Sequence, residues 1–107
     1  MSTVVLTATL PTTRKGGAPL SLSEIASVTF LRDTGSGGPG PLAVVNGPFT
    51  DTVAFTDASP VIGTSSYLFF VTDTTGLVGE TSAPATVTVE QPLQPPVAGT
   101  LTAVVQP

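Results

Sequence analysis

The segment at residues 65–73 constrains the fold most, because its pattern is typical of a strand in the middle of a β-sheet. Its side chains alternate with a period of two, which is the period of a strand. One face would carry Tyr67, Phe69 and Val71, and the other would carry Leu68, Phe70 and Thr72. Aromatic and β-branched residues favour strands. The segment therefore predicts a central strand with one face in a hydrophobic core.

The same alternation recurs along the chain between segments that are rich in Gly, Pro and Asp. The predicted strands are residues 4–10, 25–32, 42–45, 52–57, 83–89 and 97–105, and residues 20–24 are expected to form a bend. No segment shows a helical period, so we predict an all-β fold. The 107 residues are enough for one domain with one core. We expect the core to contain Leu6, Val28, Phe30, Val53, Phe55, Tyr67, Phe69, Val71, Val87 and Val89.

Composition excludes several classes of function. Only 9% of the residues are charged, the net charge is -4, and Lys and Arg together number 3, so a nucleic-acid or anionic-membrane surface is not expected. The chain has no Cys and no His, which removes thiolate metal sites and the commonest general base. No signal peptide or membrane span is evident either, so we expect synthesis in a cytosol without export by that route.

Three features of the sequence contain residue types that can carry chemistry. The glycine-rich segment 33–41 lacks the Lys of a phosphate-binding loop, and no helical pattern follows it. The aspartates at 33, 51, 57 and 73 lie at strand ends without the spacing of a calcium loop, so turn formation is the preferred role. Arg14 and Lys15 are interpreted as part of a solvated loop. We therefore predict no enzyme activity, no cofactor, and no catalytic or metal-binding residues.

Several motifs resemble the fibronectin type III family, especially its bacterial and bacteriophage members. Residues 6–11 are similar to that family's Leu-x-Trp-x-x-Pro, and residues 17–20 to its Gly-x-Pro-Leu turn. Residues 25–32 are similar to Ile-x-x-Tyr-x-Val-Tyr-Arg, and residues 67–73 to Tyr-x-Phe-x-Val-x-Ala. The resemblance covers residues 4–89. It implies an immunoglobulin-like β-sandwich of two antiparallel sheets in Greek-key order.

The sequence departs from this family in two places. Ala8 stands where the family has a core Trp, so the core must be filled by other side chains. No counterpart of the first strand precedes Val4, whereas residues 97–105 have the composition of that strand. We therefore predict a sandwich at residues 1–90, a Pro-rich spacer at 91–96, and a displaced first strand at 97–107.

The displaced strand has two possible partners. Pairing within its own chain would make a circularly permuted domain, and pairing with a neighbouring subunit would make a strand-exchanged homo-oligomer. The spacer spans ~18 Å, enough to cross a sandwich whose sheets lie ~10 Å apart. Three prolines stiffen it and hinder a tight reversal, which favours exchange. The candidate exchange residues are Val97, Leu101, Ala103 and Val105.

A second candidate contact consists of Leu31, Leu68 and Phe70. In a type III sandwich these residues would share the outer face of one sheet, where contiguous apolar side chains mark a protein-binding surface. The alternative is that residues 42–45 cover them.

The resulting functional hypothesis is a non-enzymatic structural and interaction module. A bacteriophage virion component, such as a capsid decoration or tail protein made in the host cytoplasm, is favoured. Its partners would be further copies of itself and capsid or tail proteins. The alternative is an accessory binding module excised from a secreted, extracellular bacterial carbohydrate-active enzyme or adhesin.

Overall fold

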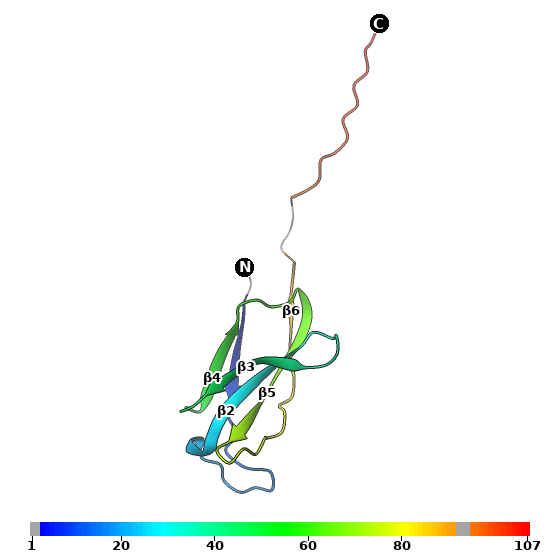
Figure 1. The fold of residues 1–107 in the computed structure, drawn as a ribbon. Helices are drawn as coiled ribbons and strands as arrows, with labels where there is room; N and C mark the ends of the chain where they lie inside the picture. Colours follow the sequence, from blue (N-terminus) through cyan, green and yellow to red (C-terminus); the bar gives the residue numbers. More distant parts are fainter. Residues whose placement is uncertain (1–2, 92–94) are drawn as a thin grey trace.

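Two antiparallel β-sheets form the body of the chain in this computed structural model, which describes residues 3–91 and 95–107 (Figure 1). The smaller sheet pairs β1 (Val4–Thr9) with β4 (Thr52–Asp57). The larger sheet has the order β3-β2-β5-β6. Its strands are β2 (Ile25–Asp33), β3 (Gly40–Asn46), β5 (Gly63–Asp73) and β6 (Ala85–Val89). The prediction of an all-β fold with two antiparallel sheets is confirmed.

The predicted central strand is confirmed as β5, which pairs with β2 on one side and β6 on the other. The predicted strands at 4–10, 25–32, 42–45, 52–57 and 83–89 are also found, with ends that shift by one or two residues. The β3 strand begins at Gly40 because a register shift at Phe30/Leu31 allows pairing to continue past it.

The bend predicted at residues 20–24 is instead a short 3-10 helix, Leu22–Glu24. The Ser21 amide donates to Glu24 Oε1 at 3.1 Å, and the Ser21 hydroxyl donates to the same oxygen at 3.0 Å. The Glu24 amide in turn donates to the Ser21 carbonyl at 3.0 Å. These reciprocal bonds close one helical turn even without a helical period, because they satisfy the amide donors of Ser21 and Glu24.

The hydrophobic core lies between the two sheets. Of the predicted core residues, Val28, Phe30, Val53, Tyr67 and Val71 are buried, whereas Leu6, Phe55 and Phe69 are half-buried and pack against the core. Ala8, Leu10 and Ile25 are buried as well. The Phe30 ring stacks on Phe55, with centroids 5.6 Å apart, and lies 6.4 Å from Phe69. These rings supply aromatic volume in a core where Ala8 has none.

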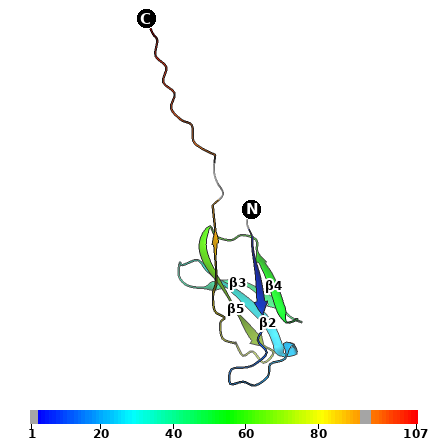
Figure 2. The same cartoon turned by 180° about the vertical axis from the view of Figure 1, so that it is seen from behind.

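Val87 and Val89 were wrongly predicted to belong to the core. They are half-buried on β6 and lie outside the cluster of core residues. The reason is the unequal width of the sheets: the larger sheet has four strands and the smaller sheet has two. The smaller sheet does not extend far enough to cover β6 fully (Figure 2).

The C-terminal segment at residues 95–107 forms no strand in this single chain, and all of its residues are exposed. It runs as an extended tail beyond the end of β6 (Figure 1). Residues 92–94 of the predicted spacer lie outside the described residues. The segment therefore does not complete its own sandwich in this structure, and pairing with a second copy stays a prediction.

Candidate functional site

The predicted contact residues Leu31, Leu68 and Phe70 lie close together on the outer face of the larger sheet. Leu31 is directly opposite Leu68 in the β2–β5 register, and Phe70 is opposite Thr29. Phe70 is therefore the diagonal neighbour of Leu31, close enough for an aromatic side chain to reach. All three side chains are half-buried.

Residues 42–45 do not lie over this face. They belong to β3, the edge strand beside β2, and Val44 is opposite Thr29 in the register. Leu42 and Val45 pack against the core, whereas Val44 is 59% exposed. The β3 strand therefore widens the apolar surface to four residues: Leu31, Val44, Leu68 and Phe70. We call these four residues the outer strip.

Hydroxyl groups border the outer strip on the β6 side. Ser66 and Thr86 hydrogen-bond across β5 and β6 at 3.1 Å, and Thr64 and Thr88 do so at 2.9 Å. In each pair the two hydroxyls hydrogen-bond to each other, and together the pairs form a polar margin beside the apolar outer strip. An apolar centre with a polar rim is the common composition of a protein-binding surface.

A cavity of about 240 Å³ lies on the open side of the sandwich, between β1 and β6. None of its lining residues is charged. The lining consists of Val4, Val5, Leu6, Thr7, Ala8, Phe30, Tyr67, Leu68, Phe69, Ser82, Ala83, Ala85 and Val87. We call this cavity the β1 groove. The sequence did not predict it, because its existence depends on the relative width of the two sheets.

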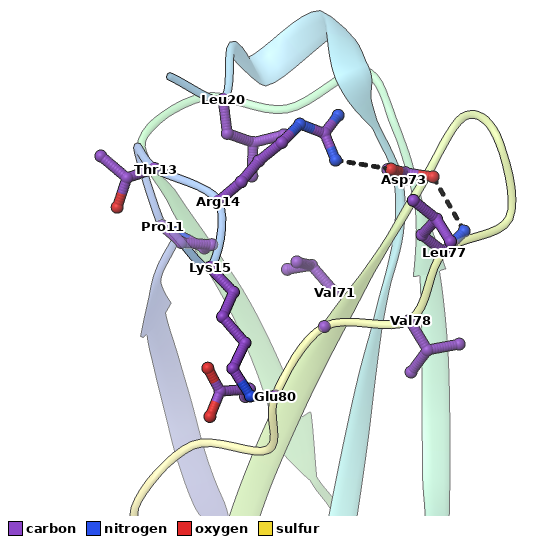
Figure 3. Close-up of a pocket in the computed structure, with 11 residues that line it drawn as sticks. Pro11, Thr13, Arg14, Lys15, Leu20, Val71, Asp73, Leu77, Val78 and Glu80 are labelled. Atoms are coloured by element: carbon purple, nitrogen blue, oxygen red, sulfur yellow. Dashed lines mark hydrogen bonds and ion pairs between the residues drawn. The ribbon is translucent and has the colours of Figure 1, made fainter. Parts of the chain in front are cut away.

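A second cavity, of about 460 Å³, lies near the loops at the end where β5 finishes (Figure 3). Arg14 reaches across it, and its Nη1 donates to Asp73 Oδ2 at 2.7 Å. Its Nη2 donates to Glu24 Oε2 at 2.9 Å. The predicted exposed loop around Arg14 is found, but Arg14 itself is half-buried. Its two ion pairs, which were not predicted, fasten the loop to Asp73 on β5 and to Glu24 in the 3-10 helix. The contact with Asp73 spans 59 residues and leaves no local signal in the sequence.

Asp73 organises the loop after β5. Its Oδ1 accepts hydrogen bonds from the Thr75 amide at 2.9 Å, the Thr75 hydroxyl at 2.7 Å and the Leu77 amide at 2.9 Å. The Arg14 guanidinium, followed by these donors, lowers the pKa of Asp73 well below its ordinary value. The predicted turn-forming role of Asp73 is confirmed. A carboxylate with these partners is a structural anchor rather than a proton-transfer group.

Acid is expected to weaken this anchor. A carboxyl whose folded-state pKa is lowered stabilises the fold above its unfolded pKa, and this contribution disappears as the pH falls through the lowered value. The unfolding temperature of wild type should therefore exceed that of Asp73→Asn at pH 7, and the gap should narrow below the ordinary carboxyl pKa of 3.8. Thermal melts from pH 7 to pH 2 measure it. Glu90→Gln, at an exposed acid after β6, is the control. A gap that stays constant with pH would contradict the assignment.

A buried carboxylate connects the two sheets at the opposite end. Asp57, at the end of β4, accepts hydrogen bonds from Tyr67 Oη at 2.7 Å and from Arg32 Nη1 at 2.8 Å. It also accepts from the Ser59 amide at 3.1 Å, which confirms its predicted turn role. Burial alone would raise the pKa of Asp57, but the hydrogen bonds from Tyr67 and Arg32 lower it overall. Burial, and then the bond to Asp57, raise the pKa of Tyr67.

One further polar side chain lies in the interior: the buried Ser65 Oγ has no hydrogen-bond partner among the residues that the structure describes. Within residues 3–91 and 95–107, no group of three or more acidic, His or Cys side chains is placed to hold a metal ion. The described residues also contain no helix long and apolar enough to cross a membrane.

Two surfaces of low charge are therefore the candidate contact sites: the outer strip and the β1 groove, which share Leu68. The outer strip contains every predicted contact residue, and the groove was not predicted. The predicted exchange residues Val97, Leu101, Ala103 and Val105 are exposed, and none of them belongs to either surface. Comparison with known proteins found no matching family model, no matching curated protein and no matching solved structure.

Proposed function

We propose that this chain is a non-enzymatic interaction module with a fibronectin type III-like sandwich. In immunoglobulin-like sandwiches the second and fifth strands share one sheet, and the third, sixth and seventh strands share the other. If β1 occupies the second position, β4 falls in the fifth, and β2, β5 and β6 fall in the third, sixth and seventh. The strand order therefore supports this fold, with no counterpart of its first strand among the strands of residues 3–91.

The outer strip is the observation that carries the proposed binding role. Leu31, Leu68 and Phe70 are neighbours on two adjacent strands, and Val44 lies on the next strand beyond Thr29 and is more than half exposed. Single exposed apolar residues are ordinary, whereas a contiguous patch with a polar rim is typical of a contact surface. The module therefore binds another protein through the outer face of the β3-β2-β5-β6 sheet.

The favoured setting is the surface of a bacteriophage virion, as a capsid decoration or tail component. The resemblance to bacteriophage type III domains supports this setting, together with a chain that carries few charges and no recognisable catalytic set. Mass spectrometry of purified particles tests it. The protein should copurify with particles through a density gradient, and a strictly cytosolic distribution would reject the virion role.

The exposed C-terminal tail favours a second candidate, a binding module from a larger secreted bacterial enzyme or adhesin. In that protein residues 97–107 would be the first strand of a following domain. The gene separates the two candidates directly. A stop codon after Pro107 favours the virion component, and an open reading frame that continues favours the excised module.

Replacing Phe70 with Ser is expected to weaken partner binding by roughly tenfold or more, since a buried Phe contributes about 1.5–3 kcal/mol. The variant should remain folded, because Phe70 is on the outer face and outside the core cluster. Sedimentation of the purified protein with particles measures the change. Ile62→Ser removes an exposed apolar side chain from the loop before β5 and serves as the matched control. Equal binding by Phe70→Ser and wild type would show that the outer strip is not the interface.

A further inference from the structure

The β1 strand has an unused hydrogen-bonding edge. It belongs to a two-stranded sheet, and among the described residues its only strand partner is β4. In an antiparallel pair, every second residue of an outer strand directs its N–H and C=O away from the partner. Such an edge accepts a further strand readily, and natural proteins cover or blunt it. In this chain nothing charged protects it: residues 4–9 are Val, Leu, Thr and Ala.

The β1 groove lies along this open edge, and it offers side-chain pockets in addition to backbone groups. Its floor includes the inward side chains of Leu6 and Ala8 on β1 and of Phe69 on β5. The far wall includes Ala83 and Val87. The larger sheet has four strands and the smaller sheet has two, so the smaller sheet leaves part of the inner face of β6 uncovered. One additional strand beside β1 would cover that part.

The C-terminal tail has the composition of that additional strand. In an extended conformation, one face of residues 97–105 carries Val97, Gly99, Leu101, Ala103 and Val105, and the other face carries Ala98, Thr100, Thr102 and Val104. The segment has no charged residue, which matches the uncharged groove. At ~3.3 Å per residue it spans roughly 30 Å, longer than the roughly 20 Å of β1. Yet Leu101 is 95% exposed, and Val97 and Val105 are exposed as well, so these side chains are not covered by any residue that the structure describes.

We propose that residues 97–105 of one copy occupy the β1 groove of a second copy, with Leu101 as the central apolar contact. The tail leaves the sandwich at the end where β1 begins (Figure 1). A tail that enters the next copy from the opposite end runs antiparallel to its β1, so the copies join head to tail. Such a contact is heterologous and generates either a closed ring or a filament. The inference deepens the proposed binding function, on which it rests, by naming a partner.

A return of the tail to its own groove is disfavoured by direction and by stiffness. Because the tail leaves at the start of β1, an immediate return would run parallel to β1, and parallel pairs are slightly less stable. The reversal would also fall on residues 90–96, where Pro92, Pro95 and Pro96 have fixed φ angles and no amide donors. A second copy needs no reversal.

The test uses two defective variants of the full-length chain. Leu101→Glu places a charge on the inserted face of the tail, and Thr100→Glu is its control on the opposite face. Ala83→Glu places a charge in the groove at an exposed position, and Thr34→Glu in the β2–β3 loop is its control. All four positions are exposed in the single chain, so each variant is expected to fold. Circular dichroism and thermal melts verify this.

Size-exclusion chromatography with light scattering, over a wide concentration range, should show oligomers for wild type and both controls. Each defective variant alone should be a monomer, with self-association weakened roughly 100-fold or more, because a buried Leu is replaced by a charge. A 1:1 mixture of Leu101→Glu and Ala83→Glu should form a dimer and nothing larger, since one intact tail meets one intact groove. This recovery would not occur if both variants damaged one symmetric patch.

Three results would overturn the inference: wild type that is monomeric at every concentration, oligomers that persist in both defective variants, or defective variants that fail to recover on mixing. The proposed function is tested separately by copurification with particles. A monomer that binds particles through the outer strip would leave the proposed function intact and remove strand exchange. Strand-exchanged oligomers that are absent from particles would leave strand exchange intact and reject the proposed virion role.

Discussion

Replacing Phe30 with Ala is expected to lower the free energy of unfolding by about 3–5 kcal/mol. Phe30 is 2% exposed, and its ring contacts Phe55 and Phe69 from the other sheet and from the neighbouring strand. The nearby core position on β1 is Ala8, which cannot expand into the space that the ring leaves. A domain of this size is commonly stable by about 5–15 kcal/mol, so the variant loses a large share of its stability.

Phe70→Ala is the matched control for this prediction, because it removes the same ring from a half-buried site on the outer face of the same sheet. Its expected cost is about 1 kcal/mol, as for ordinary substitutions outside the core. Urea denaturation measures both, and an unchanged m-value would show that the denatured states are comparable. Equal losses at the two sites would contradict a core that is confined to the space between the sheets.

The fold was predictable to the extent that it depends on local alternation. The period of two at residues 65–73 correctly identified β5 and its inward face, because a strand repeats every second residue whatever surrounds it. The error at Val87 and Val89 has the opposite cause. Alternation indicates which residues share a face, but whether anything covers that face depends on how many strands the opposite sheet contains.

For the candidate surfaces, too, local alternation was predictable from the sequence, whereas features that depend on the assembled fold were not. Leu31, Leu68 and Phe70 could be grouped from sequence because their strands are neighbours and their parities match. Val44 was missed as a member of the outer strip, since the register of β3 against β2 includes a shift that no pattern indicates. The β1 groove and the Arg14 ion pairs were missed because both arise from segments that meet only after folding.

Replacing Asp57 with Asn is expected to cost about 2–3 kcal/mol, the second largest effect of a single substitution predicted for this chain. Asp57 is 4% exposed, and it connects β4 of one sheet to Arg32 and Tyr67 of the other. Asn preserves the shape of the side chain and can still accept the Tyr67 hydrogen bond. It removes the charge, however, and Arg32 then loses its carboxylate partner in a site that is largely shielded from water.

The pH dependence of this loss separates the charge from the shape. Because the folded-state pKa of Asp57 is lowered, its ionised form stabilises the fold above the unfolded pKa, and that contribution fades as the pH falls through the lowered value. The stability gap between wild type and Asp57→Asn should therefore be largest near neutral pH and should close in acid. Asp51→Asn, at an exposed position before β4, should change stability by less than about 0.5 kcal/mol.

A double variant then shows whether Arg32 accounts for the loss. Removing both partners, as in Asp57→Asn with Arg32→Gln, should cost less than the sum of the two single substitutions, because the second change no longer leaves an unpaired charge. Chemical denaturation at pH 7 gives the three values. Strict additivity would mean that the 2.8 Å contact between Arg32 and Asp57 contributes nothing to stability, and that Tyr67 and Ser59 alone fasten the end of β4.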